Sequence, residues 1–372
     1  MDGLFRLRDF VVRHTYVNGA RLHKLDKKIE DRERPMKTDA LERLRKIYKP
    51  PVFSCDRTNV IGEAKYNLQI IIPMYNVQRY VIACLDSIFS QNTKYTYKVI
   101  VVDDGSTDSA TALITDKYKD KNISILKQRN KGTAAARNIG FAEIEADYVM
   151  FVDADDILKP GAIETLLSAA YEHNACIVEG GYENFSRGVP ISLVHNEGEV
   201  EEPCGLFWGF AWAKVFKAEL LSDVCFPDGY YYEDTIVSYI LYPKCSKAYA
   251  VRDVVYRYRR NPRGFSRIRG NDVKLLDSFW VFYYVLKVMG ERGVKISQGI
   301  YESILRSMVN CCKRLLFMND EIRKEVLNAF AEILSTDFKG FKCEESDLAI
   351  FEKTVRNNDY YKFKRILVCM RE

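Results

Sequence analysis

Short apolar segments alternate with segments of helical spacing between residues 68 and 180. The segments that read as buried strands are LQIIIP (68–73), VIVV (99–102), ISIL (123–126), YVMFV (148–152) and CIVEG (176–180). After the first of them, apolar residues recur at the spacing of one helix face, at Val81, Cys84, Leu85, Ile88 and Phe89. Apolar strands separated by helices are typical of a parallel sheet covered on both faces. The sequence therefore predicts an α/β fold, a Rossmann-like and mostly parallel sheet with helices on both faces.

The chain is predicted to have three regions. Residues 1–66 form a basic helical N-terminal extension with a break at Pro50-Pro51, residues 67–270 form the α/β domain, and residues 271–372 form a C-terminal helical subdomain. Helices of the last region are predicted over 272–290, 296–318, 320–335 and 346–370. The end of the last helix, residues 360–370, is amphipathic and basic. We favour packing within the subdomain over pairing with a second subunit or contact with a membrane.

The net charge of +5 is concentrated near the N-terminus. Residues 1–49 contain 14 Lys and Arg against 8 Asp and Glu, so the rest of the chain is nearly neutral. Two interpretations stay open: a solvated helical extension, which is favoured, and an arm that binds an anionic membrane surface or an acidic partner.

Composition indicates the cellular compartment. The ten cysteines include no C-x-x-C and the four histidines no H-x-x-x-H, which excludes a structural zinc site and fits a reducing compartment. No signal-peptide pattern is present, and the longest apolar run, 279–286, is far below the roughly 20 residues that span a bilayer. We expect a cytoplasmic protein, with peripheral contact to the inner face of the membrane as the alternative.

Polar clusters follow three of the predicted strands. PMYN (73–76) follows the first strand, DDGS (103–106) the second and DADD (153–156) the fourth. Each cluster alone is ordinary turn or cap chemistry. Because ligands bind outside the carboxyl ends of parallel strands, the three clusters are expected to share one crevice, and together they predict a binding site. Neither of the usual glycine-rich phosphate-binding motifs is present.

The DADD cluster predicts a metal site. Asp153 and Asp155, two residues apart around Ala154, can direct oxygens at one hard cation. Mg²⁺ or Mn²⁺ takes one or two protein carboxylates together with phosphate oxygens. Asp156 is expected to cap the following turn. The predicted ligand is a phosphate-bearing substrate with its metal.

Seven longer motifs make the sequence resemble the GT-A glycosyltransferases of family 2. The motifs are IIPMYN (71–76), VVDDGSTD (101–108), RNKGTAAARN (129–138), FVDADD (151–156), WAKVFKAELL (212–221), FPDGYYYEDT (226–235) and YRYRRNPRGFSR (256–267). They stand in the order and spacing of the family and cover roughly residues 67–270. The resemblance implies the GT-A, or nucleotide-diphospho-sugar transferase, fold and a nucleotide-sugar donor, for which UDP-sugars are favoured.

The resemblance also implies residues on the donor side. Asp104 would accept a hydrogen bond from a uracil N–H, Tyr75 would lie against the ring, and Asp155 would be the direct ligand of a Mn²⁺ or Mg²⁺ ion on the diphosphate. Asp153 would complete the D-x-D pair. The residues expected to bind the nucleotide are Pro73, Tyr75, Asn76, Asp103, Asp104, Arg137 and Asp153.

Glu233-Asp234 is the candidate for the catalytic pair. Transfer to a hydroxyl requires a positioned base, and the family carries its base at the second position of this pair. Asp234 is therefore the predicted base and Glu233 an acceptor-orienting neighbour. A base opposite the leaving group implies inversion of the anomeric configuration. The alternative is that the two acids only begin a helix, where first-turn acids are common.

The last motif predicts a cationic loop. Arg260, Ser266 and Arg267, with Arg259 and Arg263, are expected to bind the diphosphate, because guanidinium groups suit phosphate oxygens. A solvated surface loop is the alternative. No nucleic-acid-binding motif accompanies it, so nucleic acid is not expected as a partner.

Aromatic residues near the predicted base are weaker candidates for an acceptor site. Trp212 and Tyr232 are the two residues chosen, although side chains of this kind are more often part of a core. Many relatives read W-N-K where this chain has Trp212-Ala213-Lys214, which predicts a missing acceptor-side contact. No third protein ligand for the metal is identified.

The sequence as a whole predicts an inverting, metal-dependent, non-processive transferase. It would move a sugar from a UDP-sugar to a hydroxyl of a glycan or lipid-linked glycan in surface polysaccharide biosynthesis. A processive synthase is not expected, because no Q-x-x-R-W motif follows. The alternatives are a nucleotidyl- or phosphotransferase with the same carboxylate-metal device and a non-catalytic nucleotide-sugar-binding relative. An oligomeric state is left open.

Overall fold

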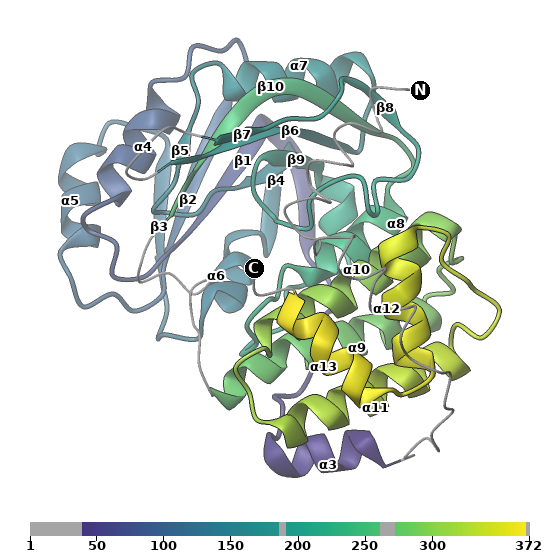
Figure 1. The fold of residues 1–372 in the computed structure, drawn as a ribbon. Helices are drawn as coiled ribbons and strands as arrows, with labels where there is room; N and C mark the ends of the chain where they lie inside the picture. The colour runs from purple at the N-terminus through teal and green to yellow at the C-terminus, as the bar shows by residue number, and fades with distance from the viewer. Residues whose placement is uncertain (1–38, 186–190, 261–271, 370–372) are drawn as a thin grey trace. The chain divides into compact units, whose positions relative to one another are not determined.

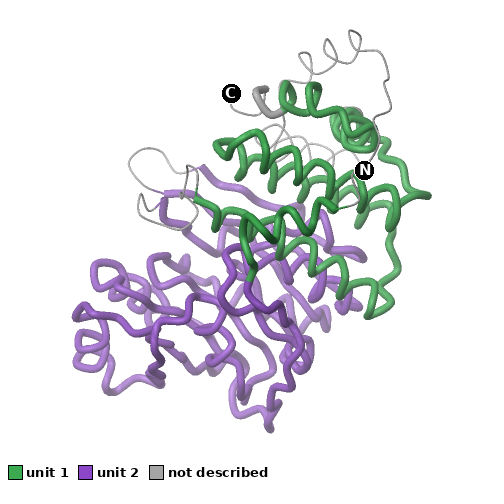
Figure 2. Tube along the Cα trace, turned by 90° about the horizontal axis from the view of Figure 1, so that it is seen from below, with its two compact units in different colours: residues 1–50, 268–372 green, residues 51–267 purple. Residues whose placement is uncertain are grey.

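The computed structural model describes residues 39–185, 191–260 and 272–369. The chain forms two compact units, one of residues 1–50 with 268–372 and one of residues 51–267, coloured green and purple in Figure 2. The first unit is thus built from both ends of the chain and the second from its middle.

Four parallel strands form one side of the sheet of residues 51–267 (Figure 1). They are β1 (Val60–Met74), β2 (Tyr97–Asp103), β3 (Ile123–Lys127) and β4 (Glu143–Phe151), arranged in the order β3-β2-β1-β4. The register places Met74 opposite Asp103 and Ile71 opposite Phe151. The carboxyl ends of β1, β2 and β4 therefore lie at one edge, as predicted from the alternation of strands and helices.

Beyond β4 the sheet is mixed. β9 (Lys214–Lys217) lies between β4 and β6 (Ile177–Phe185) and is antiparallel to both. β10 (Ala248–Arg259) runs parallel to β6 and antiparallel to β5 (Ile157–Leu158). Two short strands pair outside this order, β7 (Ile191–Leu193) with β6 and β8 (Gly198–Val200) with β10. The reversal at β9 comes after residue 180, beyond the part of the chain where strands and helices alternate regularly.

The alternating side chains of β2 explain why helices cover both faces. Val99 and Val101 belong to a core shared with α4 (Val81–Phe89), α5 (Ala110–Lys117) and α7 (Ala162–Glu172). Ile100 and Val102 pack instead with Ala136 of α6 (Thr133–Gly140). Successive side chains of a strand point to opposite faces, so α6 covers the face opposite to α4 and α7. The predicted α/β fold with helices on both faces is confirmed.

The other unit is helical in the residues that the structure describes. Its elements are α3 (Ala40–Ile47), a 3₁₀ turn η4 (Val273–Leu276), α9 (Asp277–Glu291), α10 (Gln298–Arg314), α11 (Asp320–Thr336), α12 (Ser346–Arg356) and α13 (Tyr360–Cys369). Ser297 and Asn319 cap α10 and α11, each accepting a hydrogen bond from a first-turn backbone N–H. None of the described helices is long and apolar enough to cross a membrane.

The helix predicted over 346–370 is two helices. Asn358, between α12 and α13, has a φ of 49°, a left-handed conformation that a right-handed helix cannot continue. Its side chain donates to Asn328 Oδ1 at 2.8 Å, which fixes the break. Phe363 and Ile366 of α13 are buried. The start of the amphipathic C-terminal segment therefore packs within its unit, the outcome favoured from the sequence.

The N-terminal segment contributes α3 to the helical unit. Ala40 and Leu44 are buried, Arg43 forms an ion pair with Glu325 of α11 at 2.9 Å, and Arg45 lies 5.4 Å from the ring of Trp280 in α9. Residues 1–38 lie outside the described residues, so the membrane-binding arm stays a prediction.

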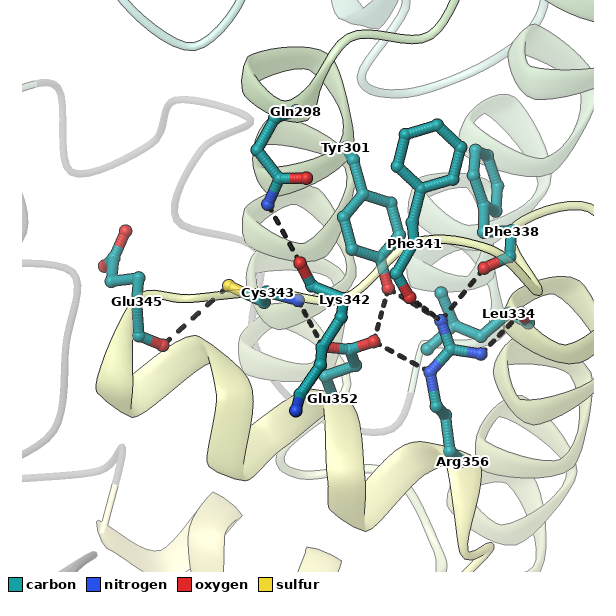
Figure 3. A network of polar contacts seen from close by, with 10 residues as sticks. All are labelled: Gln298, Tyr301, Leu334, Phe338, Phe341, Lys342, Cys343, Glu345, Glu352 and Arg356. Carbon is teal, nitrogen blue, oxygen red and sulfur yellow. Dashed lines mark hydrogen bonds and ion pairs between the residues drawn. The ribbon is translucent and has the colours of Figure 1, made fainter.

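A polar network between α10, α11 and α12 stabilises the helical unit (Figure 3). Arg356 donates to Glu352 Oε1 at 2.7 Å, to the Tyr301 hydroxyl at 2.9 Å and to three backbone carbonyl oxygens. Glu352 also accepts from the Tyr301 hydroxyl and from Cys343 N, both at 2.7 Å. The carbonyl groups belong to Leu334, Phe338 and Phe341, at and beyond the end of α11. The guanidinium of Arg356 thus supplies hydrogen bonds to carbonyl groups at the end of α11 and to a buried carboxylate of α12.

Arg356→Met should destabilise the protein by about 2–3 kcal/mol, because it leaves three carbonyl groups without this donor and removes the cation that pairs with the buried Glu352. Chemical denaturation followed by circular dichroism measures the change. The control is Lys364→Met, which removes an ion pair with Asp320 between half-exposed side chains and should change stability by less than about 0.5 kcal/mol. Equal effects of the two substitutions would contradict the network's role.

Candidate active site

Hydrogen bonds join the loops that follow β1 and β2. Asn76 Oδ1 accepts from Thr107 N at 2.8 Å, and Asn76 N donates to Ser106 Oγ at 3.1 Å. Asp103 accepts from Ser106 N at 2.8 Å and from Thr111 Oγ1 at 2.6 Å. Burial opposes the shift, but these hydrogen bonds leave the pKa of Asp103 below its usual value. Asn76 and Asp103, both predicted to bind the nucleotide, shape the two loops.

Asp104 is held by the loop that precedes α6. It is buried, and its carboxylate accepts from Gln128 Nε2 at 2.7 Å and from the backbone N–H groups of Lys131 and Gly132, both at 2.8 Å. A carboxylate offers about four acceptor positions, so one remains for a ligand N–H. Gly105 has a φ of 77°, and a Cβ there would lie 2.9 Å from a backbone nitrogen of the facing loop, so only glycine fits.

Tyr75 and Pro73 border this position at the end of β1. The Tyr75 side chain is 44% exposed, although it is aromatic. Pro73 is half-buried and pairs with Val102 of β2. Asp104 N donates to Met74 O at 2.8 Å, which keeps the two strand ends together. A nucleotide base held by Asp104 would therefore have an exposed ring nearby to stack on.

Arg137 of α6 connects the two sides of the candidate site. It is 4% exposed, and its guanidinium donates to Asp153 Oδ1 at 3.0 Å and to Glu233 Oε1 at 2.6 Å. Burial opposes protonation, but the charges of Asp153, Glu233 and Asp234 raise the pKa of Arg137 above its usual value. The guanidinium predicted to frame the nucleoside is thus bound to two carboxylates of the protein.

Glu233 and Asp234 lie in a locally unusual backbone. Tyr232 before them has a φ of 63°, which is rare for a bulky residue, and a π-helix, η2 (Val237–Leu241), follows. Both features occur preferentially at functional sites. Burial raises the pKa of Glu233 to about 7, against the effect of Arg137. The two acids also precede a helical segment, as the alternative interpretation predicted.

The carboxylates of DADD fall into two kinds. Asp153 and Asp155 are half-buried, whereas Asp156 is 1% exposed. Burial, with the charges of Asp153 and Asp155, raises the pKa of Asp156 well above its usual value. Asp156 accepts from Tyr256 and Arg259 of β10 instead of capping its own turn. Asp153 and Asp155, the two less buried acids of this cluster, are therefore the better placed of the three to meet a cation, and Asp153 also accepts from Arg137.

These two carboxylates fit a hard divalent cation that takes its other ligands from a substrate. In the described parts of the chain, no three His, Cys, Asp or Glu side chains form a ready metal-binding group. Two protein carboxylates are nevertheless what Mg²⁺ or Mn²⁺ uses when it is shared with phosphate oxygens.

The predicted cationic loop is described only at its start. Arg260 is exposed, and its backbone N–H donates to Phe185 O at 3.1 Å. Ser266, Arg267 and Arg263 lie outside the described residues.

Comparison with known proteins identifies the family. A family model described as glycosyl transferase family 2 matches residues 69–218. Glycosyltransferase GlyG of Streptococcus pneumoniae is 31% identical over 221 residues, which are 54% of this chain and 73% of GlyG. The chain belongs to glycosyltransferase family 2. The resemblance drawn from the motifs is confirmed.

A second relative is longer than this family 2 chain. Glycosyltransferase GlyA of Streptococcus pneumoniae is 31% identical over 220 residues, 54% of this chain but 32% of GlyA, so the match spans about a third of that relative's length. Among solved structures, S. aureus TarS 1–349 in complex with UDP-GlcNAc is similar with a TM-score of 0.65 at 20% identity, over 82% of this chain and 91% of that one. This likeness confirms the GT-A fold.

The W-A-K segment of this family 2 domain is internal. Lys214 is completely buried, forms an ion pair with the equally buried Glu179, and donates to Trp208 O at 2.6 Å and to the Tyr242 hydroxyl at 2.7 Å. Burial lowers the pKa of Lys214, against the effect of Glu179. Glu179 also contacts His195 Nε2 at 2.5 Å. Tyr242 is the first residue of α8 (Tyr242–Lys244), which follows η2. The hydrogen bond from Lys214 to its hydroxyl therefore links β9 to α8.

Ala213 is the residue at which this chain departs from W-N-K. It has a φ of 61°, a left-handed conformation that asparagine adopts more readily than alanine. The residue is only 2% exposed, so its side chain faces the interior. The substitution of asparagine by alanine thus bears on backbone strain, and no acceptor contact is expected from this position.

Trp212 is part of an aromatic core. Its ring lies parallel to those of Phe210 at 4.4 Å, Tyr256 at 4.7 Å and Tyr258 at 5.3 Å, and it is 6% exposed. This packing agrees with the interpretation of such residues as core. Tyr232 is half-buried, and its acceptor role stays a prediction.

The sequence contains a signal for the buried ion pair between Lys214 and Glu179. Glu179 stands in the apolar strand CIVEG and Lys214 in the apolar segment AKVF. A charged residue in a buried strand requires a partner of opposite charge, so the two could have been paired with each other.

Ala213→Gly should stabilise the protein by about 0.5–1 kcal/mol, because glycine removes the left-handed strain at a smaller entropic cost. Thermal unfolding measures the shift. The matched control is Ala211→Gly, two residues earlier and equally buried but without a positive φ, which should be destabilising. Destabilisation by both substitutions would rule out strain at Ala213.

Proposed function

We propose that this protein is an inverting, metal-dependent glycosyltransferase that moves a sugar from a UDP-sugar to a hydroxyl of a glycan or lipid-linked glycan in surface polysaccharide biosynthesis. The observation that carries the proposal is the Arg137 bridge. It joins Asp153, in the predicted metal-binding loop, to Glu233, the neighbour of the predicted base. Family membership and the similar fold of TarS, whose structure contains UDP-GlcNAc, support a nucleotide-sugar donor.

The donor side binds the nucleotide through groups that are already fixed. Asp104 keeps one acceptor position for a uracil N–H, and Tyr75 offers an exposed ring for the base. Asp155 and Asp153 would hold Mn²⁺ or Mg²⁺, which when bound stabilises charge on the leaving diphosphate. The exposed Arg260 adds a cation at the end of β10.

The acceptor side supplies the base. The acceptor hydroxyl oxygen attacks the anomeric carbon, the bond from that carbon to the diphosphate oxygen breaks with its electron pair leaving on UDP, and the hydroxyl proton passes to Asp234. Attack opposite the leaving group inverts the anomeric carbon. Glu233 accepts from Arg137 through Oε1, which helps to fix the position of its neighbour Asp234. The proposed role of Glu233 is to orient the acceptor.

Asp234→Asn should lower the release of nucleoside diphosphate from the best donor in a screen of UDP-, GDP- and dTDP-sugars by about 10²–10⁴-fold, since it removes a general base. UDP affinity, measured by calorimetry, should stay within about threefold. Asp253→Asn, at an exposed acid of β10, is the control and should leave both quantities unchanged. Lost UDP binding in Asp234→Asn would move this residue out of the base role, and a screen without turnover would favour a binding relative.

Asp155→Asn should abolish the gain in UDP affinity that Mn²⁺ gives, a loss of about tenfold or more, because it removes a charged metal ligand. Calorimetric titration of UDP with and without Mn²⁺ measures it. Asp116→Asn, at an exposed acid of α5, is the control. A metal effect that survives in Asp155→Asn would assign the metal to other ligands.

Deleting residues 1–38 should weaken co-sedimentation with phosphatidylglycerol vesicles, because this segment carries most of the N-terminal positive charge. The deletion stops before α3, which is packed in the helical unit. Neutral phosphatidylcholine vesicles are the control. Unchanged binding to anionic vesicles would leave the segment without a membrane role.

A further inference from the structure

A single buried hydroxyl joins the metal-binding loop to a strand about 100 residues later. Tyr256 of β10 is completely buried. Its hydroxyl donates to Asp156 Oδ2 at 2.8 Å and accepts from Asp153 N at 3.1 Å. The backbone of Asp153 is therefore fixed by a side chain from another part of the sheet.

Arg259, at the end of the same strand, fixes the other side of the loop. Its backbone N–H donates to Asp156 Oδ1 at 2.6 Å, and its Nε donates to Asp155 O at 2.6 Å. The guanidinium lies 4.8 Å from the ring of Tyr80 and 4.5 Å from that of Phe185, which restricts its rotation.

These contacts are made to the backbone of the loop and to Asp156, and not to the carboxylates of Asp153 and Asp155. Tyr256 contacts the backbone of Asp153, and Arg259 contacts the backbone of Asp155. Both oxygens of Asp156 accept from β10. A carboxylate that only capped its own turn would not need partners from a distant strand.

We propose that Asp156, Tyr256 and Arg259 are positioning residues. They hold the backbone of the loop so that the carboxylates of Asp153 and Asp155 are placed to share one divalent cation. The inference rests on the proposed function, because it takes Asp153 and Asp155 as metal ligands. None of the three residues needs to touch the substrate. Their effect is preorganisation: without them the loop must be ordered when the metal binds.

The test is a Mn²⁺ titration of UDP binding by Tyr256→Phe and Asp156→Asn. Phenylalanine keeps the stacking on Trp212 and removes only the hydroxyl, so the fold is expected to be preserved. Both variants should require about tenfold more Mn²⁺ for half-maximal UDP binding, whereas UDP affinity without metal should not change. If the two residues had a merely structural role, UDP binding would be weakened both with and without Mn²⁺, or in neither case.

Tyr249→Phe is the matched control, since it removes a hydroxyl from the same strand, where the ring stacks on His173, and it should leave the titration unchanged. An unchanged Mn²⁺ requirement in Tyr256→Phe and Asp156→Asn, with metal-dependent UDP binding intact in the wild type, overturns the inference alone. A wild type without metal-dependent UDP binding overturns the proposed function and the inference together.

Discussion

A buried guanidinium between two carboxylates is the interaction on which the candidate site depends. Arg137 is almost inaccessible to water, and its two partners come from loops that are far apart in sequence. A buried charge is tolerated only when it is paired and hydrogen-bonded, so each of the three groups requires the other two. The loop that carries Asp153 and the segment that carries Glu233 are thereby held together before any ligand binds.

The helix that presents Arg137 also organises the nucleotide side. The loop entering α6 supplies the backbone N–H groups of Lys131 and Gly132 to Asp104. Four of the buried residues of α6 are small, Ala134, Ala135, Ala136 and Gly140, which lets the helix lie close to the sheet. One short helix therefore sets the relative position of a base-recognition carboxylate and a charge-bridging cation, and a shift of this helix would disturb both.

The sequence was sufficient for the positions of the first four strands along the chain, the helices on both faces and the edge where polar residues gather. These features depend on local periodicity and on general rules of sheet topology. The reversal at β9 and the break at Asn358 depend on contacts made after the chain has folded. The same holds for Arg137: the family resemblance implied a contact with the nucleoside, but the carboxylates that it binds are decided by tertiary geometry. Trp212 was a weak candidate for the acceptor site, but it belongs to the core. The rings stacked on it come from β10 and from the loop before β9, which the sequence alone does not bring together.

The helical unit is built from both ends of the chain, so it cannot be completed until translation is nearly finished. α3 leaves the ribosome early, but its partners in α9 and α11 are made only after the whole of residues 51–267. At about 5–20 residues per second, α3 waits roughly 15–60 seconds for them. The sheet-containing unit can complete its own contacts in that interval, while the short amphipathic helix, which is marginal in isolation, remains accessible to chaperones and proteases.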